Sequence, residues 1–567
     1  MMMTGGQALA RQLQRQGITE VFGIPGIQLD WAVDGLRELS NSIRFIVPRH
    51  EQSTSYMADG YARTTGRIGT CMIVPGPGLL NAMAGLATAY ACNSRVLCIA
   101  GSIPSPAIGK GFGMLHEVER QSDILGTVTK WHSAATATGG IPDLVREAVR
   151  QLKGGRPRPV GIEVAPDLLK ASAEMDLLTP FADDNGLIGA DPAAIDKAAA
   201  LLELSRFPVI YVGGGVLAAG ASQALQDVAE RLQAPVVMSE NGRGALSDRH
   251  PLALTSLAGR AVFPHADVVL VVGSRYVDNA LGTPAWTSDR IRTIFLNVEP
   301  ADWAPPRAAD IKIHADARLG LQALAATLPR RQNPMALELD KVRAWAEQQS
   351  NELEPQTSWV RALRAAIPED GILVSELTQV GYCTRFMYPV YGPNTFILPG
   401  YQGTLGYGFP TALGAAVGNP RRPVVSITGD GGFGWNMQEL ATARKYNLRV
   451  VTVVFNDHHF GNVRTMQRQQ FGQDQTYGVD LFNPRFDKLA EAFDIPFARV
   501  NRPDNLEGVL REALNAGGPS LIEAEVAEMP SPWHLMRLKV PPFAKAGRPA
   551  PPNPLGDPDG TSTGHRK

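Results

Sequence analysis

Short apolar runs alternate with longer segments of helical period along most of this 567-residue chain. From Ile43 onward the order is strand, helix, strand, helix, strand, which predicts a parallel sheet joined by right-handed crossovers. A similar rhythm returns near Phe207 and again near Gly371. We therefore expect an α/β fold with three doubly wound parallel-sheet domains. The segments of the first repeat are IRFIV, EQSTSYMADGYAR, TCMIV, LLNAMAGLATAYA and RVLCIAG.

Lapses in this rhythm mark the predicted domain boundaries. The chain is too long for one hydrophobic core, and the stretches at 178–190 and 330–355 lack strand patterning. The last stretch is rich in Pro and Gly, so we expect it to be partly mobile, at least beyond Pro551. The predicted units are an N-terminal domain at 1–177, a central domain at 190–330, a C-terminal domain at 356–530 and a tail at 531–567.

The charge balance argues against attraction of the whole protein to nucleic acid or to an anionic membrane. Lys and Arg number 54 against 55 Asp and Glu, which gives a formal net charge of -1. The four cysteines show neither metal-site spacing nor the density of a disulfide framework. The first residues lack the apolar core of a signal peptide, and no run of about 18 apolar residues occurs. We expect a cytoplasmic protein that does not span a membrane.

Two acidic motifs follow predicted strands of the third domain. The strand VVSIT runs into Gly429, Asp430, Gly431 and Gly432, and the strand VVTVVF runs into Asn456 and Asp457. Both acids are then at carboxyl ends of parallel strands, where open α/β sheets bind ligands. Two carboxylates suit a Mg²⁺ ion that also binds a diphosphate, and the glycines let backbone N–H groups approach the phosphates. The alternative is that each motif is an ordinary Gly/Asp turn.

The two motifs, with the helical MQELATARKYN between them, resemble the motif of thiamine diphosphate enzymes, which runs from GDG to an Asn-Asn pair. The resemblance implies that Gly429 to Gly432 lie beside the diphosphate. It also implies that Asp430, Asp457 and the backbone carbonyl of His459 hold the metal ion. Asp457 replaces the usual second Asn, which keeps an oxygen ligand and adds a negative charge near the diphosphate.

The first domain carries a candidate activating acid, Glu51, where the strand IRFIV leads into a helix. The segment PRHEQSTSYMADGYARTTG resembles the part of the family that contains the coenzyme-activating glutamate. By that resemblance Glu51 shares a proton with N1′ of the aminopyrimidine, which promotes the tautomer whose N4′ deprotonates the thiazolium C2. A mostly buried carboxyl with a raised pKa would suit this role. The alternative is a charge that only favours the helix dipole.

Two glycine-rich stretches fit the same reading. PGPGLLNAMAGLATAY places Gly76 ahead of a helix, and GYQGTLGYGFPTALGAA is a glycine-rich helix entry. By resemblance the Gly403 carbonyl accepts from the 4′-amino group of the coenzyme. Leu405 would be the apolar wedge that bends the coenzyme so that N4′ reaches C2, with an ordinary core leucine as the alternative.

From about Gly5 to Pro530 the chain most resembles the acetolactate synthase large subunit and related 2-oxo acid decarboxylases and carboligases. FGIPG, RHEQ, ADGYAR, GPG, YVGGG, GDGGF and QELATA lie in that family's order. The resemblance implies decarboxylation of a small-molecule 2-oxo acid with carboligation. The alternatives are a decarboxylase with a larger substrate, a 2-hydroxyacyl lyase, or a catalytically silent paralogue that binds the coenzyme. An oxidoreductase centred on YVGGG would need a dinucleotide fingerprint that is absent.

Several residues depart from the synthase pattern and leave the donor and acceptor substrates open. Ile27 stands where synthases have Gly and pyruvate decarboxylases have a catalytic Asp. His116 stands where synthases show Gln, so an imidazole could relay protons near the substrate, or it could only cap a helix or meet a carboxylate. Met466 replaces an expected Trp. In the tail, Trp533, His534 and Arg537 could close over the active site or dock on the surface.

The resemblance also bears on FAD and on assembly. Acetolactate synthases hold FAD around the central domain, but their Asp-Asp-Arg run is Val277-Asp278-Asn279 here, which argues against FAD. In the family the activating glutamate and the diphosphate site meet across a subunit interface. We therefore expect a homodimer at minimum, with a homotetramer as a pair of dimers.

Overall fold

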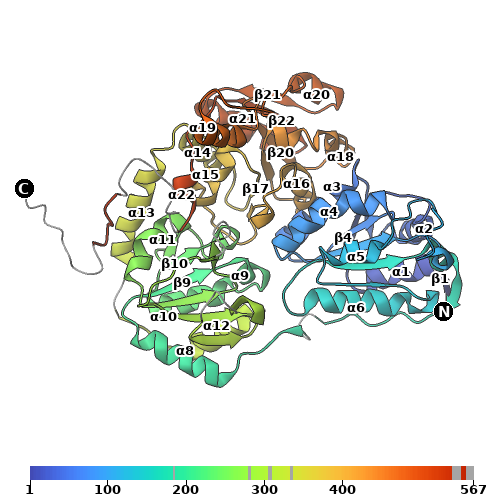
Figure 1. Ribbon diagram of the computed structural model, residues 1–567, viewed down its shortest axis with the longest axis horizontal. Helices are drawn as coiled ribbons and strands as arrows, with labels where there is room; N and C mark the ends of the chain where they lie inside the picture. The colour runs from blue at the N-terminus through green and yellow to red at the C-terminus, as the bar shows by residue number, and fades with distance from the viewer. Residues whose placement is uncertain (183–185, 279–282, 304–308, 333–335, 539–550, 557–567) are drawn as a thin grey trace, which may run out of the picture.

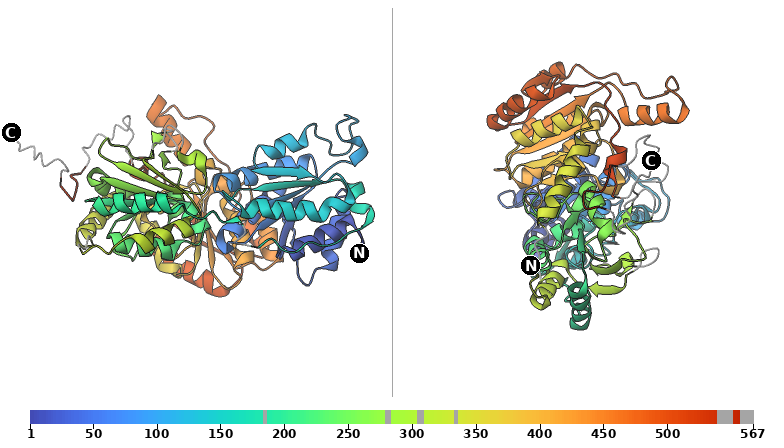
Figure 2. Two further views of the ribbon diagram at one scale, coloured as in Figure 1. Left: turned by 90° about the horizontal axis from the view of Figure 1, so that it is seen from below. Right: turned by 90° about the vertical axis from the view of Figure 1, so that its left-hand side faces the viewer.

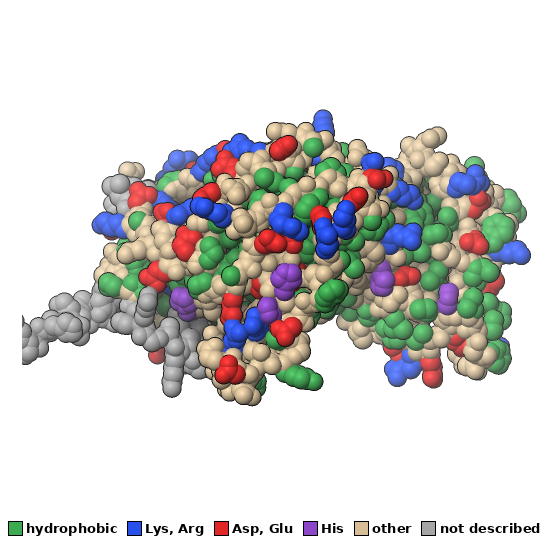
Figure 3. Space-filling view, turned by 90° about the horizontal axis from the view of Figure 1, so that it is seen from above, with side chains coloured by type: hydrophobic (Ala, Val, Ile, Leu, Met, Phe, Trp, Pro, Cys, Tyr) green, Lys and Arg blue, Asp and Glu red, His purple; other side chains and the backbone are tan. Residues whose placement is uncertain are grey.

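The computed structural model describes residues 1–182, 186–278, 283–303, 309–332, 336–538 and 551–556. Three α/β domains follow one another, each built on a six-stranded sheet, as the repeated strand–helix rhythm predicted. The N-terminal and central domains lie at opposite ends of the molecule, and the C-terminal domain contacts both (Figures 1 and 2). No helix in the described part of the chain is long and apolar enough to cross a membrane. On the face in Figure 3, acidic and basic side chains are interspersed.

The N-terminal domain has a parallel sheet with helices on both faces. α1 (Gly5–Arg15), α2 (Asp30–Glu38) and α6 (Ile141–Lys153) share one core, and α3 (Glu51–Thr65) and α4 (Pro77–Ala91) share another. The domain begins earlier than the predicted rhythm, because α1, β2 (Glu20–Gly23) and α2 precede Ile43. The strand order is β3 (Arg44–Ile46), β2 (Glu20–Gly23), β4 (Gly69–Ile73), β5 (Val96–Gly101), β7 (Val160–Val164) and β6 (Trp131–Ala134).

The central domain repeats this architecture. Its run VVLVV forms β12, which is buried on both faces, as is usual for an inner strand of a parallel sheet. The main helices are α8 (Pro192–Leu204), α10 (Ser222–Leu232), α11 (Ser256–Val262) and α12 (Ala317–Thr327). The strand order is β11 (Ala253–Leu254), β10 (Val236–Met238), β9 (Pro208–Val212), β12 (Val268–Val272), β15 (Arg292–Asn297) and β16 (Ile311–His314).

The C-terminal domain carries the strands that end in the two acidic motifs. The segment predicted to be helical between them is helical over 437–445, where a short 3₁₀ turn, η8 (Met437–Glu439), leads directly into α18 (Leu440–Lys445). Other helices are α14 (Gln356–Ala366), α15 (Gln379–Met387), α16 (Gly408–Gly418), α19 (Gly461–Phe471) and α21 (Pro503–Ala516). The strand order is β18 (Phe396–Ile397), β17 (Ile372–Ser375), β19 (Val424–Gly429), β20 (Val450–Asn456), β22 (Ser520–Glu525) and β21 (Phe497–Val500).

The tail returns to the body of the protein. Its short helix α22 (Trp533–Met536) packs on α15, and the Trp533 ring lies 5.1 Å from the ring of Tyr382. Further on, Asn553 Nδ2 donates to the Ala261 carbonyl at 3.0 Å. Residue 553 thus has a backbone partner in the central domain, whereas the expected mobility beyond Pro551 stays a prediction, and 557–567 lies outside the described residues.

Helices α3 and α16 bring the N-terminal and C-terminal domains into close contact (Figure 1). Gly60 faces the Thr411 carbonyl and Gly414 faces the Met57 carbonyl, so closely that a Cβ at either glycine would overlap that oxygen. Side chains of the two helices share a core of buried residues from both domains, which includes Tyr56, Met57, Ala412 and Leu413. The two glycines therefore allow the interdomain contact at its present distance.

We predict that Gly60→Ala lowers the thermal midpoint of unfolding, because the added methyl group pushes α3 away from α16. The expected loss of stability is about 1–3 kcal/mol, as for other overpacked interfaces. Gly508→Ala is the matched control, since Gly508 lies within α21 and a Cβ there meets open space. This control should gain up to about 1 kcal/mol from helix propensity. If Gly60→Ala melts as high as the control, the close approach of α3 and α16 does not constrain the fold.

Candidate active site

The two acidic motifs meet at one edge of the C-terminal sheet. Asp430 is the first residue of α17 (Asp430–Phe433), directly after β19, and Asp457 directly follows the neighbouring strand β20. Asp430 is only 3% exposed. Burial raises the pKa of Asp430, and the negative charge of Asp457 raises it further. Burial also raises the pKa of Asp457. A cation between these carboxylates would offset both effects.

This donor set fits a magnesium ion. The described residues contain no cluster of three or more His, Cys, Asp or Glu that could enclose a metal. The protein thus offers two carboxylates, and backbone, water or coenzyme oxygens would complete the octahedron that Mg²⁺ requires. The His459 ring is engaged elsewhere, because its Nε2 lies 2.7 Å from an Arg464 nitrogen and 3.2 Å from Asp480 Oδ1. The backbone carbonyl of His459, and not its ring, therefore remains the predicted metal ligand at this position.

Two amide side chains that the sequence motifs did not indicate hold the acids in place. Gln379 Nε2 donates to Asp457 Oδ2 at 2.6 Å, and Gln379 Oε1 accepts from the Met529 backbone N–H at 2.6 Å. Asn483 Nδ2 donates to Asp430 Oδ2 at 2.7 Å and to Asn456 Oδ1 at 2.9 Å. Gln379 begins α15, just beyond the carboxyl end of β17, and this position at the sheet edge could have indicated a site residue. Asn483 does not follow a strand, so its position in the sequence gave no such indication.

A buried glutamate, Glu376, supports the glycine-rich loop around Leu405. Its carboxylate accepts from the backbone N–H groups of Gly406 (2.7 Å) and Gly408 (2.8 Å) and from Thr428 Oγ1 (3.0 Å). Burial raises the pKa of Glu376 to about 7. A Cβ at Gly432 would overlap Glu376 Oε1, so this position of the GDGG motif must be glycine.

The loop that Glu376 holds contains the predicted coenzyme contacts. Gly403 has a φ of 57°, and Gly431 is packed so that a Cβ would lie 2.7 Å from the Phe460 ring. Leu405 is half-buried, whereas Tyr407 and Phe409, which follow it, are buried in the core. Its partial exposure distinguishes Leu405 from an ordinary core leucine.

In the N-terminal domain, Glu51, Gly76 and His116 gather at the carboxyl ends of the strands. Glu51 begins α3, is half-buried, and accepts from Asn81 Nδ2 at 3.0 Å. Gly76 has a φ of 60° and approaches the His116 backbone so closely that a Cβ would overlap the His116 carbonyl. A Cβ on Gly78 would lie 3.8 Å from Glu51 Cγ.

The His116 imidazole is neither a helix cap nor a carboxylate partner through Nδ1. Within the described residues, this nitrogen is buried without a hydrogen bond. The neighbouring Leu115 carbonyl accepts from Gln28 Nε2 at 3.2 Å, which brings the loop after β2 to the same place. Ile27 in that loop is 68% exposed. The loops after β2, β4 and β5 thus form one edge around Glu51.

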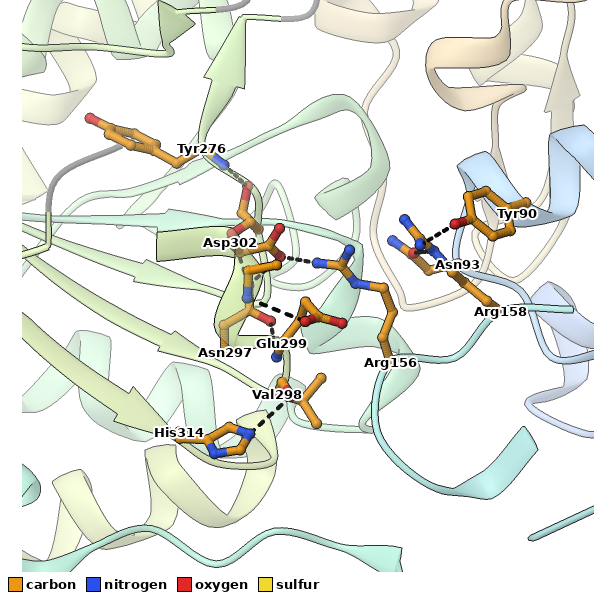
Figure 4. Close-up of polar contacts among 12 residues, drawn as sticks. Tyr90, Asn93, Arg156, Arg158, Tyr276, Asn297, Val298, Glu299, Asp302 and His314 are labelled. Carbon is orange, nitrogen blue, oxygen red and sulfur yellow. Dashed lines mark hydrogen bonds and ion pairs between the residues drawn. The ribbon is translucent and has the colours of Figure 1, made fainter. Parts of the chain in front are cut away.

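A cavity of about 550 Å³ lies between the three domains. It extends from the glycines at 213–215 and Gly273 to Gly403 and the tail residues Trp533 and Arg537. Figure 4 shows Arg156 pointing from the end of the N-terminal domain toward Asp302, with which it forms an ion pair. Asn297 Nδ2 also donates to Asp302, at 2.9 Å.

The cavity walls carry polar atoms without a partner. In the described part of the chain, Tyr276 Oη and Asn241 Oδ1 are buried and make no hydrogen bond. They fit a polar ligand in general. The fit to FAD is poorer, because Val277 replaces an expected Asp, and position 279, where Arg is expected, is Asn and lies outside the described residues. Of the tail residues, Trp533 and Arg537 line this cavity, and Trp533 Nε1 donates to Asn462 Oδ1 at 2.8 Å.

Comparison with known families agrees with this architecture. The N-terminal TPP binding domain of thiamine pyrophosphate enzymes matches residues 3–124, their central domain matches 195–324, and their C-terminal TPP binding domain matches 379–524. Fold and comparison together define a thiamine diphosphate-dependent enzyme of the carboligase and decarboxylase class. The chain belongs to the thiamine pyrophosphate enzyme family.

Individual relatives cover nearly the whole chain. It is 33% identical to the probable 2-ketoarginine decarboxylase AruI of Pseudomonas aeruginosa, over 92% of this chain and 94% of the relative. It is 32% identical to the probable acetolactate synthase large subunit of Methanocaldococcus jannaschii, over 92% of this chain and 91% of the relative. It is 30% identical to the acetolactate synthase isozyme 3 large subunit of Escherichia coli (strain K12), over 90% of this chain and 92% of the relative.

We predict that Asp457→Asn weakens divalent-metal binding to the coenzyme-free chain by about tenfold, because one of two neighbouring carboxylates is lost. Coenzyme binding at saturating metal should persist, since the amide oxygen can still coordinate. Electron paramagnetic resonance of free Mn²⁺ measures the first effect. Asp474→Asn removes an exposed charge from the segment after α19 and should leave Mn²⁺ binding unchanged. Equal Mn²⁺ affinity in wild type and Asp457→Asn would remove Asp457 from the metal site.

Proposed function

We propose that this enzyme uses thiamine diphosphate and Mg²⁺ to decarboxylate a 2-oxo acid and to transfer the remaining acyl unit to an acceptor carbonyl, as acetolactate synthases do. The observation that carries the proposal is the pairing of two strand-end sites in one chain. Glu51 stands at the edge of the N-terminal sheet, and Asp430 and Asp457 stand together at the edge of the C-terminal sheet. A coenzyme with an aminopyrimidine at one end and a diphosphate at the other requires both.

Each group has a chemical task in this proposal. Thiamine diphosphate, when bound, supplies a nucleophilic carbon and an electron sink for the decarboxylation. Asp430, Asp457 and the His459 carbonyl would hold the metal on the diphosphate. Glu51 would hold a proton at N1′ of the aminopyrimidine, and the Gly403 carbonyl would accept from its 4′-amino group.

His116 supplies a second proton carrier near the substrate in this proposal. Its Nδ1 has no hydrogen-bond partner in the described chain, and its backbone packs against Gly76 at the edge where Glu51 lies. An imidazole beside the 2-oxo group would be able to accept or donate a proton through its ring nitrogens.

The proposal includes a homodimer in the cytoplasm, with a homotetramer as a pair of dimers. Large apolar side chains are exposed beside both half-sites, which is typical of surfaces that meet a partner. On the N-terminal side these are Ile108, Phe112 and Leu115, and on the C-terminal side Val463, Met466, Phe471 and Phe482. A second copy would cover them and would bury Glu51, which is half-buried in one chain. FAD stays outside the proposal.

A second candidate is a decarboxylase that acts on a larger, cationic 2-oxo acid and releases the aldehyde. The similarity to a probable 2-ketoarginine decarboxylase favours it. In addition, Met466 is 52% exposed where the synthases carry a bulky Trp, which leaves room beside α19. An acidic residue that could attract a cationic substrate, Glu528, lies next to Met529, whose backbone N–H donates to Gln379. Glu528 also forms an ion pair with Arg468 of α19.

A panel of 2-oxo acids distinguishes these functions. Purified protein with thiamine diphosphate and Mg²⁺ should release CO₂ from pyruvate and form acetolactate, identified by mass. If 2-ketoarginine reacts instead and yields an aldehyde, the second candidate is correct. If no 2-oxo acid reacts while the coenzyme still binds, 2-hydroxyacyl lyase substrates come next. Inertness toward those substrates as well would leave a catalytically silent paralogue.

We predict that Glu51→Gln still binds the coenzyme but turns over about 10²- to 10⁴-fold more slowly, because the amide cannot share the proton at N1′. Coenzyme binding is measured by fluorescence quenching and turnover by CO₂ release. Glu119→Gln is the matched control, since it removes the same charge from an exposed position of the same domain. Undiminished turnover of Glu51→Gln would remove Glu51 from the mechanism.

A further inference from the structure

One buried amide, Asn436, connects the start of α3 to the loop that carries Leu405. Asn436 is only 1% exposed and lies in the turn between α17 and η8. Asn436 Nδ2 donates to the Gly406 carbonyl, one residue after Leu405. Asn436 Oδ1 accepts from Gln52 Nε2 at 2.8 Å and from Ser53 Oγ at 3.2 Å. Gln52 and Ser53 directly follow Glu51.

Each end of this connection is fixed by a second buried acid. At the loop, Glu376 accepts from the N–H groups of Gly406 and Gly408, so both the N–H and the carbonyl of Gly406 are hydrogen-bonded. At the helix, the carboxylate of Glu439 accepts from the N–H groups of Arg49 and His50, each at 3.0–3.1 Å. The residues before and after Glu51 are therefore both bonded to the segment 436–439 of the C-terminal domain.

Little in this network can adjust independently. Glu439 and Ser53 are fully buried, so a donor or acceptor that loses its partner here destabilises the fold by its full desolvation free energy. Gly406 also packs tightly, since a Cβ there would lie 2.9 Å from Trp435 Cβ. A displacement of the Leu405 loop must therefore be passed through Asn436 to the first turn of α3.

We propose that Asn436 is a positioning residue that sets Glu51 and Leu405 of one chain relative to each other. The inference rests on the proposed function. In the proposed dimer, the Glu51 of a chain serves one coenzyme and its Leu405 serves the other. Asn436 is then a mechanical link between the two active sites.

The first test measures exchange of the thiazolium C2 proton for deuterium in bound coenzyme, by NMR. Asn436→Ala should slow this exchange roughly tenfold to hundredfold at saturating thiamine diphosphate and Mg²⁺, the size expected when reacting groups shift by about an ångström. Gln438→Ala should exchange at the wild-type rate, because within the described chain this half-buried neighbour donates only to the local Trp435 carbonyl. A purely structural role would lower the folded fraction and leave the exchange rate of bound coenzyme unchanged. Wild-type exchange in Asn436→Ala overturns the proposal.

The second test uses hybrid dimers of wild-type and variant chains, co-expressed with two affinity tags. A hybrid with one Leu405→Ala chain should keep about half of the activity, because one site is intact. A hybrid with one Asn436→Ala chain should fall well below half, because a single change reaches both sites. If the two hybrids are equally active, Asn436 does not link the sites.

Two controls separate this inference from the proposed function. If Glu51→Gln leaves C2 exchange unchanged, the mechanism itself is wrong. A hybrid of one Glu51→Gln chain and one Leu405→Ala chain should recover activity, because one of its sites receives both intact residues. If it does not recover, the shared-site dimer fails. If both controls behave as expected and Asn436→Ala is silent, only the role of Asn436 is wrong.

Discussion

The packing of α3 against α16 is the contact on which the rest of the structure depends. It fixes the N-terminal sheet, which ends at Glu51, against the C-terminal sheet, which ends at Asp430 and Asp457. Two glycines, Gly60 and Gly414, make the distance short by letting each helix meet a backbone carbonyl of the other. Because protein interiors are close-packed, such an interface transmits displacement instead of absorbing it. The network around Asn436 lies at the end of this contact.

Burial of charge is the second constraint. Asp430, Asp457, Glu376 and Glu439 all have pKa values raised by burial, and all are surrounded by donors from backbone or amide side chains. For Glu376 and Glu439 the donors are backbone N–H groups and hydroxyls, so these acids hold loops in place. For Asp430 and Asp457 the donors leave lone pairs at the sheet edge, where a cation would bind. Similar residues thus serve structure in one place and ligand binding in another.

Local pattern predicted the elements that local physics controls. The strand–helix rhythm from Ile43 and the three parallel sheets are confirmed, because alternation of buried strands and amphipathic helices is written in consecutive residues. The helical prediction for MQELATARKYN is confirmed over 437–445, where a first 3₁₀ turn leads into α18. The sequence did not indicate that Glu439 in this turn accepts from the backbone N–H groups before α3. The composition of the tail did not reveal the partner that Asn553 has at the Ala261 carbonyl.

The sequence by itself determined the class of fold, the coenzyme family and the residues at the strand ends, because strand, turn and motif residues lie next to one another in the chain. Only the tertiary structure decided what supports them. Gln379 and Met529 lie 150 positions apart, Ser53 and Asn436 lie 383 apart, and Asn483 reaches back 53 positions to Asp430. Hydrogen bonds over such separations leave no periodicity or spacing in one sequence. They exist only because the packed helices and sheets bring these side chains within bonding distance.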